Sequence, residues 1–277
     1  MLYSYNILVF GDEPVKKSVD RLLRYGYDAI ELVGEPDRYD WEETRKLIAD
    51  GGFQAASVCN IYSGEQRDLT SADPEKRENA VKYVTKTISM AEAVGAGTVI
   101  IAPTENMRIK RELPSAEDEW AMAVENIRRC AREAEKRGIQ LVIEPWNRFE
   151  THLVNRLEQA VQLASDVDMP NVAIMGDLFH MNIEEANIPR AIRDAGKWLR
   201  HTHIADNQRD LPGKGHLDWP EIIKALKDIG FTGSLVLEYI PPHADPYFAF
   251  REKVDDSVYD EHARYAIEFM RDLVERE

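Results

Sequence analysis

Four polar residues, Glu144, Asp177, His203 and Glu238, are separated along the chain by 33, 26 and 35 residues. Each stands at or near the end of an apolar stretch, as Glu144 does after residues 141–143. One such glutamate alone would be explained by a structural salt bridge. The strand-and-helix units of a (β/α)8 barrel, however, take roughly 30 residues each, and the barrel gathers its functional groups at the C-terminal ends of its strands. The four side chains are therefore predicted to converge, and three carboxylates with one imidazole indicate a divalent metal site.

A repeating pattern of buried strands and amphipathic helices is expected to position these groups. Several apolar stretches follow a glycine that can end the preceding helix, and helix starts are marked by caps such as Asp73 before Pro74 and Ser115 three residues before Asp118. Ligand-type residues on four consecutive strand ends favour a closed barrel over an open, doubly wound sheet. We therefore predict an α/β fold, a single-domain (β/α)8 TIM barrel over residues 1–277. Its strands are expected near residues 6–10, 28–33, 53–59, 97–102, 139–144, 172–176, 199–205 and 234–239.

Composition narrows the class of protein. The 277 residues are 44% hydrophobic and contain no apolar run approaching the roughly 18 residues of a membrane span, and the N-terminus shows no signal-peptide pattern, so we expect a cytoplasmic protein without membrane contact. With 35 basic and 50 acidic residues, the net charge of −15 argues against a nucleic-acid partner. The two cysteines, Cys59 and Cys130, match no metal or redox spacing and are expected to be buried, reduced thiols.

Several short motifs in the second half of the chain resemble the D-tagatose 3-epimerase-like ketose epimerases of the xylose isomerase-like TIM barrel superfamily. The resemblance covers residues 138–240 and is specific, because the motifs recur in the family's order and at its separations. The motifs are Asn147-Arg148-Phe149-Glu150, Phe179-His180-Met181-Asn182-Ile183-Glu184-Glu185, His201-Thr202-His203 with Asn207-Gln208-Arg209 downstream, Pro212-Gly213-Lys214-Gly215, and Glu238.

The resemblance implies a role for each group. It makes Glu144, Asp177, His203 and Glu238 the metal ligands, with Glu144 and Glu238 also forming the acid/base pair. It further implies that three other residues bind the carbonyl end of a small sugar substrate: Glu150, His180 and Arg209. Inverting carbon 3 of a ketose removes a proton next to the carbonyl and returns it from the opposite face, which requires two bases and a stabilised enediolate but no organic cofactor.

The types of ligand and the family resemblance limit the choice of metal ion and of oligomeric state. Carboxylate and imidazole ligands favour Mn²⁺, Co²⁺ or Mg²⁺ over a thiolate-seeking metal, and we expect Mn²⁺ or Co²⁺. A homo-oligomer, either a dimer or a tetramer, is possible on this fold.

Other functions on the same barrel stay open at this point. An aldose–ketose isomerase, an inosose dehydratase or an isomerase of oxidised sugars could use a similar metal and enolate. An apurinic-site endonuclease needs additional histidines from earlier strands, whereas the first histidine here is His152. A sugar-binding barrel without activity is disfavoured by the intact glutamate pair.

Some neighbouring residues carry weaker expectations. His201 shares a strand face with His203 and is expected to be a hydrogen-bonded core histidine rather than a ligand. Trp146 and the aromatic group Tyr247, Phe248 and Phe250 are candidates for the wall of a sugar pocket, although packing or a subunit interface would explain them equally well.

Overall fold

The strands of the protein close into a parallel barrel. The computed structural model describes residues 1–63, 66–240 and 255–277, and within them eight strands pair in sequence order, with the last returning to the first. Leu2 of the first strand lies opposite Ser234 of the eighth, which completes the ring. The strands are β1 (Leu2–Asn6), β2 (Ala29–Gly34), β3 (Gln54–Asn60), β4 (Thr98–Ile101), β5 (Gln140–Ile143), β6 (Val172–Asp177), β7 (Leu199–Ile204) and β8 (Ser234–Leu237).

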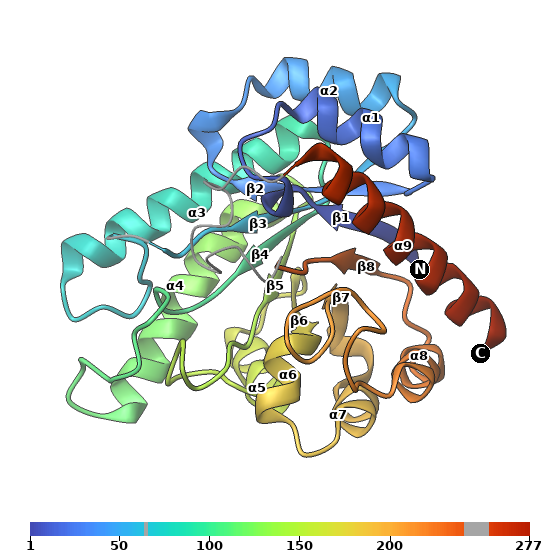
Figure 1. The fold of residues 1–277 in the computed structure, drawn as a ribbon. Coiled ribbons are helices and arrows are strands. Elements are labelled where there is room, and N and C mark those ends of the chain that lie inside the picture. Colours follow the sequence, from blue (N-terminus) through green and yellow to red (C-terminus); the bar gives the residue numbers. More distant parts are fainter. Residues whose placement is uncertain (64–65, 241–254) are drawn as a thin grey trace.

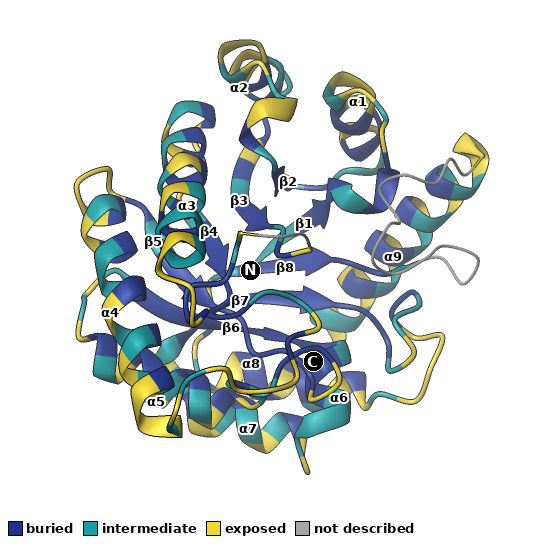
Figure 2. Ribbon diagram, turned by 90° about the vertical axis from the view of Figure 1, so that its left-hand side faces the viewer, coloured by how far each residue is buried: buried dark blue, intermediate teal, exposed yellow. Residues whose placement is uncertain are grey.

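Helices surround the barrel, as Figure 2 shows by the exposed faces that they turn away from the buried strands. Two helices, rather than one, connect β6 to β7. The helices of the described residues are α1 (Val15–Tyr25), α2 (Trp41–Asp50), α3 (Pro74–Val94), α4 (Ala116–Glu135), α5 (Leu157–Val167), α6 (Leu178–Glu184), α7 (Ile188–Ala195), α8 (Trp219–Asp228) and α9 (Asp256–Arg276). Short 3-10 turns cover Ile7–Phe10, Pro36–Arg38 and Gly196–Trp198.

The helix caps confirm the local reading of the sequence. The Asp73 carboxylate accepts a hydrogen bond from the Glu75 backbone at the start of α3, and the Ser115 hydroxyl accepts one from the Asp118 backbone at the start of α4. These bonds satisfy backbone donors that the first turn of a helix leaves free. The last helix, α9, lies beside α1, so the two ends of the barrel's helical layer meet (Figure 1).

The first strand differs from the prediction. The apolar residues 7–10 were expected to be strand, but they form a 3-10 turn, and β1 ends at Asn6. The cause is local: the Asn6 side chain accepts a hydrogen bond from the Leu8 backbone at 2.9 Å and so caps the turn. The other seven strands lie within two residues of their predicted limits.

The core has an inner and an outer part. Inside the barrel, apolar side chains of β3 to β6 form one compact cluster, which contains Cys59, Ile100, Val142, Ala173 and Met175. A larger apolar layer fills the space between the strands and the helices. Cys59 and Cys130 are both buried and unpaired, as expected. No helix in the described parts of the chain combines the length and apolarity needed to span a membrane, and the cytoplasmic location stays a prediction.

Candidate active site

The four spaced residues converge at the C-terminal ends of neighbouring strands. Glu144 directly follows β5, Asp177 ends β6, His203 lies near the end of β7, and Glu238 directly follows β8. All four are buried. One ligand atom from each of Glu144, Asp177 and His203 can be chosen so that all lie within 4.8 Å of one another. Glu238 completes the cluster, because its Oε2 lies 3.2 Å from Nδ1 of His203.

Two atoms of this cluster lack hydrogen-bond partners among the described residues: Nδ1 of His203 and Oδ2 of Asp177. Nδ1 also lies 3.7 Å from Oε1 of Glu144. Buried polar atoms normally find a partner, so two unpaired atoms in one buried cluster indicate a bound group. An imidazole nitrogen beside three carboxylates has the donor chemistry of a site for a divalent cation. The residues present therefore fit a metal ion.

A fifth acidic residue, Glu31 of β2, orients the histidines and was missed by the sequence reasoning. It is fully buried and accepts hydrogen bonds from Nε2 of His203 at 2.8 Å, from Nε2 of His201 at 2.9 Å and from the Ser57 hydroxyl. By holding Nε2 of His203, it leaves Nδ1 as the nitrogen that faces the cluster. His201 is thus a hydrogen-bonded core histidine, as predicted. A charged residue within the apolar run Ala29–Gly34 was the available signal.

Glu150, His180 and Arg209 lie beside the cluster and line one pocket with two of its members, Glu144 and Glu238. Nδ1 of His180 accepts hydrogen bonds from the Asn147 backbone at 3.2 Å and from its side-chain amide at 2.8 Å. This assigns the ring proton to Nε2, which lies 3.6 Å from Oδ2 of Asp177. The amides of Asn147 and Asn106 each donate to one oxygen of Glu150, at 2.9 and 2.8 Å.

Arg209 links the pocket to the cluster. Its Nη2 donates to Oε2 of Glu238 at 2.8 Å and lies 3.6 Å from Oδ2 of Asp177. Its guanidinium also stacks 4.9 Å from the ring centroid of Phe179. The Arg209 backbone has a φ of 64°, a left-handed conformation that non-glycine residues seldom adopt and that often marks functional sites.

The clustered acidic side chains differ in their pKa values. Burial, reinforced by the neighbouring Glu238 and Asp177, raises the pKa of Glu144 to about 8 against the opposing effect of His203. Burial likewise raises the pKa of Asp177 to about 6, although Arg209 opposes it. For Glu238, His203 and Arg209 outweigh burial and lower the pKa to about 2. The isolated cluster thus holds protons at neutral pH that a dication would displace.

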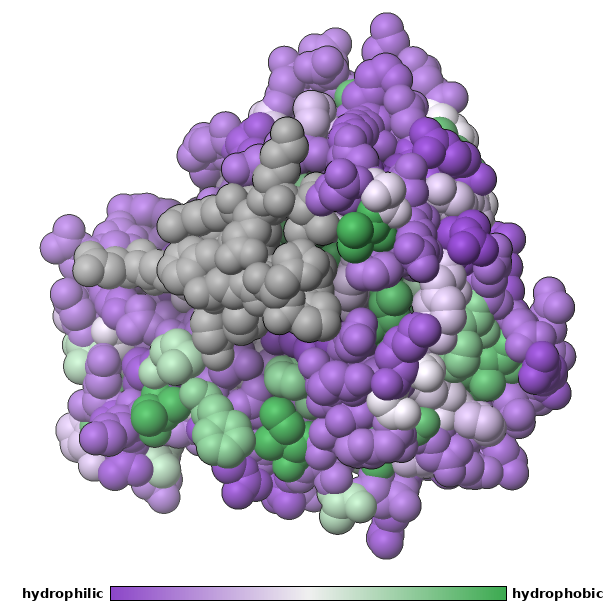
Figure 3. Space-filling model, viewed as in Figure 1, coloured by the Kyte–Doolittle hydropathy of each residue, from purple (hydrophilic) through white to green (hydrophobic). Residues whose placement is uncertain are grey.

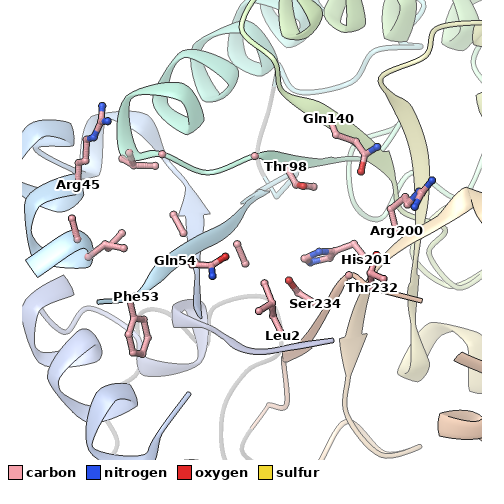
Figure 4. A pocket seen from close by; sticks show the side chains of 18 residues that line it. Leu2, Arg45, Phe53, Gln54, Thr98, Gln140, Arg200, His201, Thr232 and Ser234 are labelled. Atoms are coloured by element: carbon pink, nitrogen blue, oxygen red, sulfur yellow. The ribbon is translucent and has the colours of Figure 1, made fainter. Parts of the chain in front are cut away.

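A larger cavity at the other end of the barrel has different chemistry. Figure 4 shows it lined by neutral polar side chains such as Gln54, Thr98 and Ser234 and by two arginines, Arg45 and Arg200, with His201 pointing into it. It lies at the N-terminal ends of the strands, and no carboxylate is among its described lining residues. Barrel enzymes place their chemistry at the opposite, C-terminal face. The candidate active site is therefore the pocket over Glu144 and Glu238.

The aromatic expectations are met in part. Trp146 lines the pocket and packs with Tyr62, with ring centroids 5.6 Å apart. Tyr247, Phe248 and Phe250 lie outside the described residues, so their role stays a prediction. Asn106 and Asn60 also belong to the site, and as single polar side chains in a loop or at a strand end they carried no spacing signal, whereas Asn147 stands in the motif that contains Glu150.

Comparison with known families decides the wider relationship. A family model described as a xylose isomerase-like TIM barrel matches residues 19–273. The protein belongs to the xylose isomerase-like TIM barrel family. The match extends over both halves of the chain, which agrees with strands and helices that alternate from the first residues onward and not only around the motifs at residues 138–240.

Relatives within the family are sugar epimerases. D-psicose 3-epimerase from Ruminiclostridium cellulolyticum is 30% identical over 275 residues, covering 94% of this chain and 92% of the relative. 3-Dehydro-D-guloside 4-epimerase from Escherichia coli is 28% identical over 250 residues, covering 88% and 94%. The crystal structure of D-psicose 3-epimerase with D-tagatose from Clostridium cellulolyticum H10 has a TM-score of 0.88 at 28% identity and covers 99% of both chains. This xylose isomerase-like barrel is accordingly a sugar epimerase, and hence an isomerase.

Proposed function

We propose that the protein is a divalent-metal-dependent ketose epimerase that inverts the carbon next to the substrate's carbonyl group, carbon 3 of a 2-ketose. The observation that carries the proposal is the cluster of Glu144, Asp177, His203 and Glu238, in which two buried ligand atoms lack partners among the described residues. Glu144 and Glu238 follow strands three places apart in the ring, so they approach the pocket from different sides.

The side chains of the pocket divide the reaction between them. One of Glu144 and Glu238 takes the proton from the carbon next to the carbonyl, and the other delivers a proton to the opposite face, with the roles exchanged in the reverse direction. Nε2–H of His180 and the guanidinium of Arg209 donate hydrogen bonds to substrate oxygens, and Glu150, held by two amides, accepts one from a hydroxyl. When bound, the divalent ion supplies positive charge that stabilises the enediolate.

The four metal ligands are proposed to be Glu144, Asp177, His203 and Glu238, and the ion to be Mn²⁺ or Co²⁺, with Mg²⁺ also compatible. Hard carboxylate oxygens and one imidazole support this choice. Elemental analysis of the purified protein, followed by removal of the metal and titration with each ion, measures stoichiometry and preference. A stoichiometry that stays at one in His203→Ala contradicts the ligand assignment.

Exchange of the carbon-bound hydrogen tests the reaction. The metal-loaded enzyme is incubated in deuterated water with a panel of ketoses and keto-sugars, and NMR follows deuterium entering the carbon next to the carbonyl. A proton-transfer epimerase incorporates solvent deuterium into its product. Intact transfer of the hydrogen from substrate to product indicates hydride transfer instead and favours an aldose–ketose isomerase.

A second candidate is a 4-epimerase of 3-keto sugars, supported by the similarity to the Escherichia coli 3-dehydro-D-guloside 4-epimerase over 88% of this chain. The chemistry is equivalent, because carbon 4 of a 3-keto sugar also lies next to the carbonyl. The same two glutamates would serve it. Including 3-keto glycosides in the deuterium panel separates the two candidates by the position that becomes labelled.

We also propose that the enzyme self-associates as a homodimer. Three of the exposed large apolar side chains, Met107, Ile109 and Phe149, come from the loops after β4 and β5, which a bridge between Arg108 and Thr151 joins. Apolar surface on the face shown in Figure 3 is gathered in patches within a hydrophilic surround. Light scattering should give twice the chain mass, and Phe149→Ser should shift the protein towards monomer. A monomeric wild-type protein contradicts the proposal.

A further inference from the structure

Two buried polar side chains on the β3 side of the pocket have no hydrogen-bond partner among the described residues. Asn60, the last residue of β3, is 4% exposed, and neither its amide nitrogen nor its amide oxygen is hydrogen-bonded within residues 1–63, 66–240 and 255–277. Tyr62 is 3% exposed, and its hydroxyl is likewise unpaired there. Both side chains line the same pocket as His180 and Arg209. Leaving such groups unsatisfied costs free energy, so their placement in a pocket indicates a ligand that supplies the missing bonds.

The position of these groups complements that of the metal cluster. In the closed ring, β3 lies four strands from β7, which carries His203, and is therefore on the opposite side of the barrel. The cluster residues follow or end β5 to β8. A sugar whose carbonyl end is held at the cluster thus extends its remaining carbons towards Asn60 and Tyr62.

The surrounding structure holds both side chains in place. At Gly34 of β2, a Cβ atom would lie 2.7 Å from both Cα and Oδ1 of Asn60, so only glycine allows this close packing behind the amide. The Tyr83 hydroxyl accepts a hydrogen bond from the Ile61 backbone at 2.8 Å and donates one to the Gly34 carbonyl at 2.7 Å, which anchors the start of the loop. The Tyr62 ring packs edge-on against Trp146. The two groups are therefore preorganised rather than free to find other partners.

The hydrogen-bonding groups of Asn60 and Tyr62 indicate which kind of ligand group they bind. An amide offers donors and an acceptor, and a sugar hydroxyl can serve both. Burial raises the pKa of Tyr62, so its hydroxyl stays neutral and can donate or accept. Phosphate or carboxylate oxygens offer only acceptors once ionised, and Arg209, already paired with Glu238, is the sole Lys or Arg side chain among the described lining residues. The subsite suits uncharged hydroxyls.

We propose that Asn60 and Tyr62 form a hydroxyl-recognition subsite for the end of the sugar remote from its carbonyl group, and that they discriminate among substrates there. The inference rests on the proposed function, because it takes the metal cluster as the place where the carbonyl end binds. It names the substrate class more narrowly: an uncharged sugar with free hydroxyls at the distal carbons, rather than a sugar phosphate or a sugar acid.

The test compares variants and substrates in one cycle. A ketose that the wild-type enzyme converts is assayed beside analogues that each lack one hydroxyl remote from the carbonyl. The variants are Asn60→Ala, Tyr62→Phe, which removes only the unpaired hydroxyl, and Gln162→Ala, an exposed amide on α5, as the matched control. For the parent sugar, kcat/KM should fall by about 10- to 100-fold in Asn60→Ala and in Tyr62→Phe, the range expected for an unpaired buried partner. Metal affinity should be unchanged.

The decisive comparison is between sugars. For at least one deoxy analogue, the wild type should lose about as much kcat/KM as the variants do, and the variants should process that analogue and the parent within about twofold of each other. Equal losses for every sugar, or unchanged kcat/KM in Asn60→Ala and Tyr62→Phe, overturn the subsite while leaving the epimerase assignment intact. A wild-type enzyme that exchanges hydrogen on no sugar of the panel overturns the proposed function, and the subsite with it.

Discussion

Replacing Glu31 with glutamine gives a sharp test of how the proposed metal site is organised. The carboxylate is fully buried and accepts from three donors: Nε2 of His203, Nε2 of His201 and the Ser57 hydroxyl. Although burial opposes ionisation, the two histidines hold the pKa of Glu31 well below its usual range. Glutamine keeps the shape but has one acceptor oxygen and introduces an NH₂ donor. Oε2 of Glu31 accepts from both His201 and Ser57, whereas Oε1 accepts from His203 alone, so the amide oxygen of Glu31→Gln is expected at the Oε2 position and His203 loses its acceptor.

The size of the effect follows from these contacts. A hydrogen bond to a charged group contributes about 1.5–3 kcal/mol, and the loss of a partner that orients a metal-binding histidine typically weakens metal affinity by about 10- to 100-fold. That range corresponds to about 1.4–2.7 kcal/mol of binding free energy. We expect a Mn²⁺ dissociation constant raised within this range in Glu31→Gln, because the tautomer that leaves Nδ1 of His203 free is no longer enforced.

Isothermal titration of the metal-free protein with Mn²⁺ measures the change at a fixed pH. Glu117→Gln, an exposed glutamate on α4, is the matched control and should bind as the wild type does. Circular dichroism checks that Glu31→Gln is folded. A folded Glu31→Gln protein that binds Mn²⁺ within about threefold of the wild type refutes the orienting role.

Three further predictions test the site. Arg209→Ala should keep its metal stoichiometry yet lose turnover, and loss of the metal in elemental analysis would contradict its assignment to the substrate. Glu144→Gln and Glu238→Gln should each abolish epimerisation while retaining exchange from one face; full activity of either variant in the NMR assay disproves the two-base mechanism. Mn²⁺ affinity should rise with pH from about pH 6 upward, because three proposed ligands must release protons to bind: Asp177 (pKa about 6), Glu144 (pKa about 8) and His203, whose pKa is raised by Glu238 and Glu31 against the effect of burial. Titrations in buffers of different ionisation enthalpy count those protons, and a flat profile argues against this coupling.

Much of the barrel and of the cluster follows from patterns local to the chain. Apolar strands alternating with capped helices repeat at the length of a barrel unit, and parallel strands with helical crossovers present their C-terminal ends on one face. Residues such as Glu144 and Glu238 could therefore be brought together from their spacing alone. The motifs around His180 and Arg209 further predicted, through the family resemblance, that these two residues bind the substrate.

Other features depended on how the strands align around the ring. Glu31 lies 170 residues from His201 and meets it across the barrel interior, where β2 shifts register against β3 between Ile30 and Glu31. A second shift between Ile174 and Met175 changes the alignment of β6 with β7. Such irregularities re-aim side chains, and no periodic pattern in the sequence announces them.

The end of β1 and the burial of Asn60 also depended on contacts that the sequence pattern does not reveal. The run at residues 7–10 is apolar enough for a strand, but a single hydrogen bond from the Leu8 backbone to the Asn6 side chain ended the strand. Asn60 is an ordinary polar residue in the sequence, and only closure of the barrel buried it in the pocket, where its side chain has no hydrogen-bond partner within the described part of the chain. Periodicity and spacing thus determined the barrel and which strands carry the four clustered residues. The tertiary structure decided which side chains meet across its interior, because closure and register bring together residues that are remote in sequence.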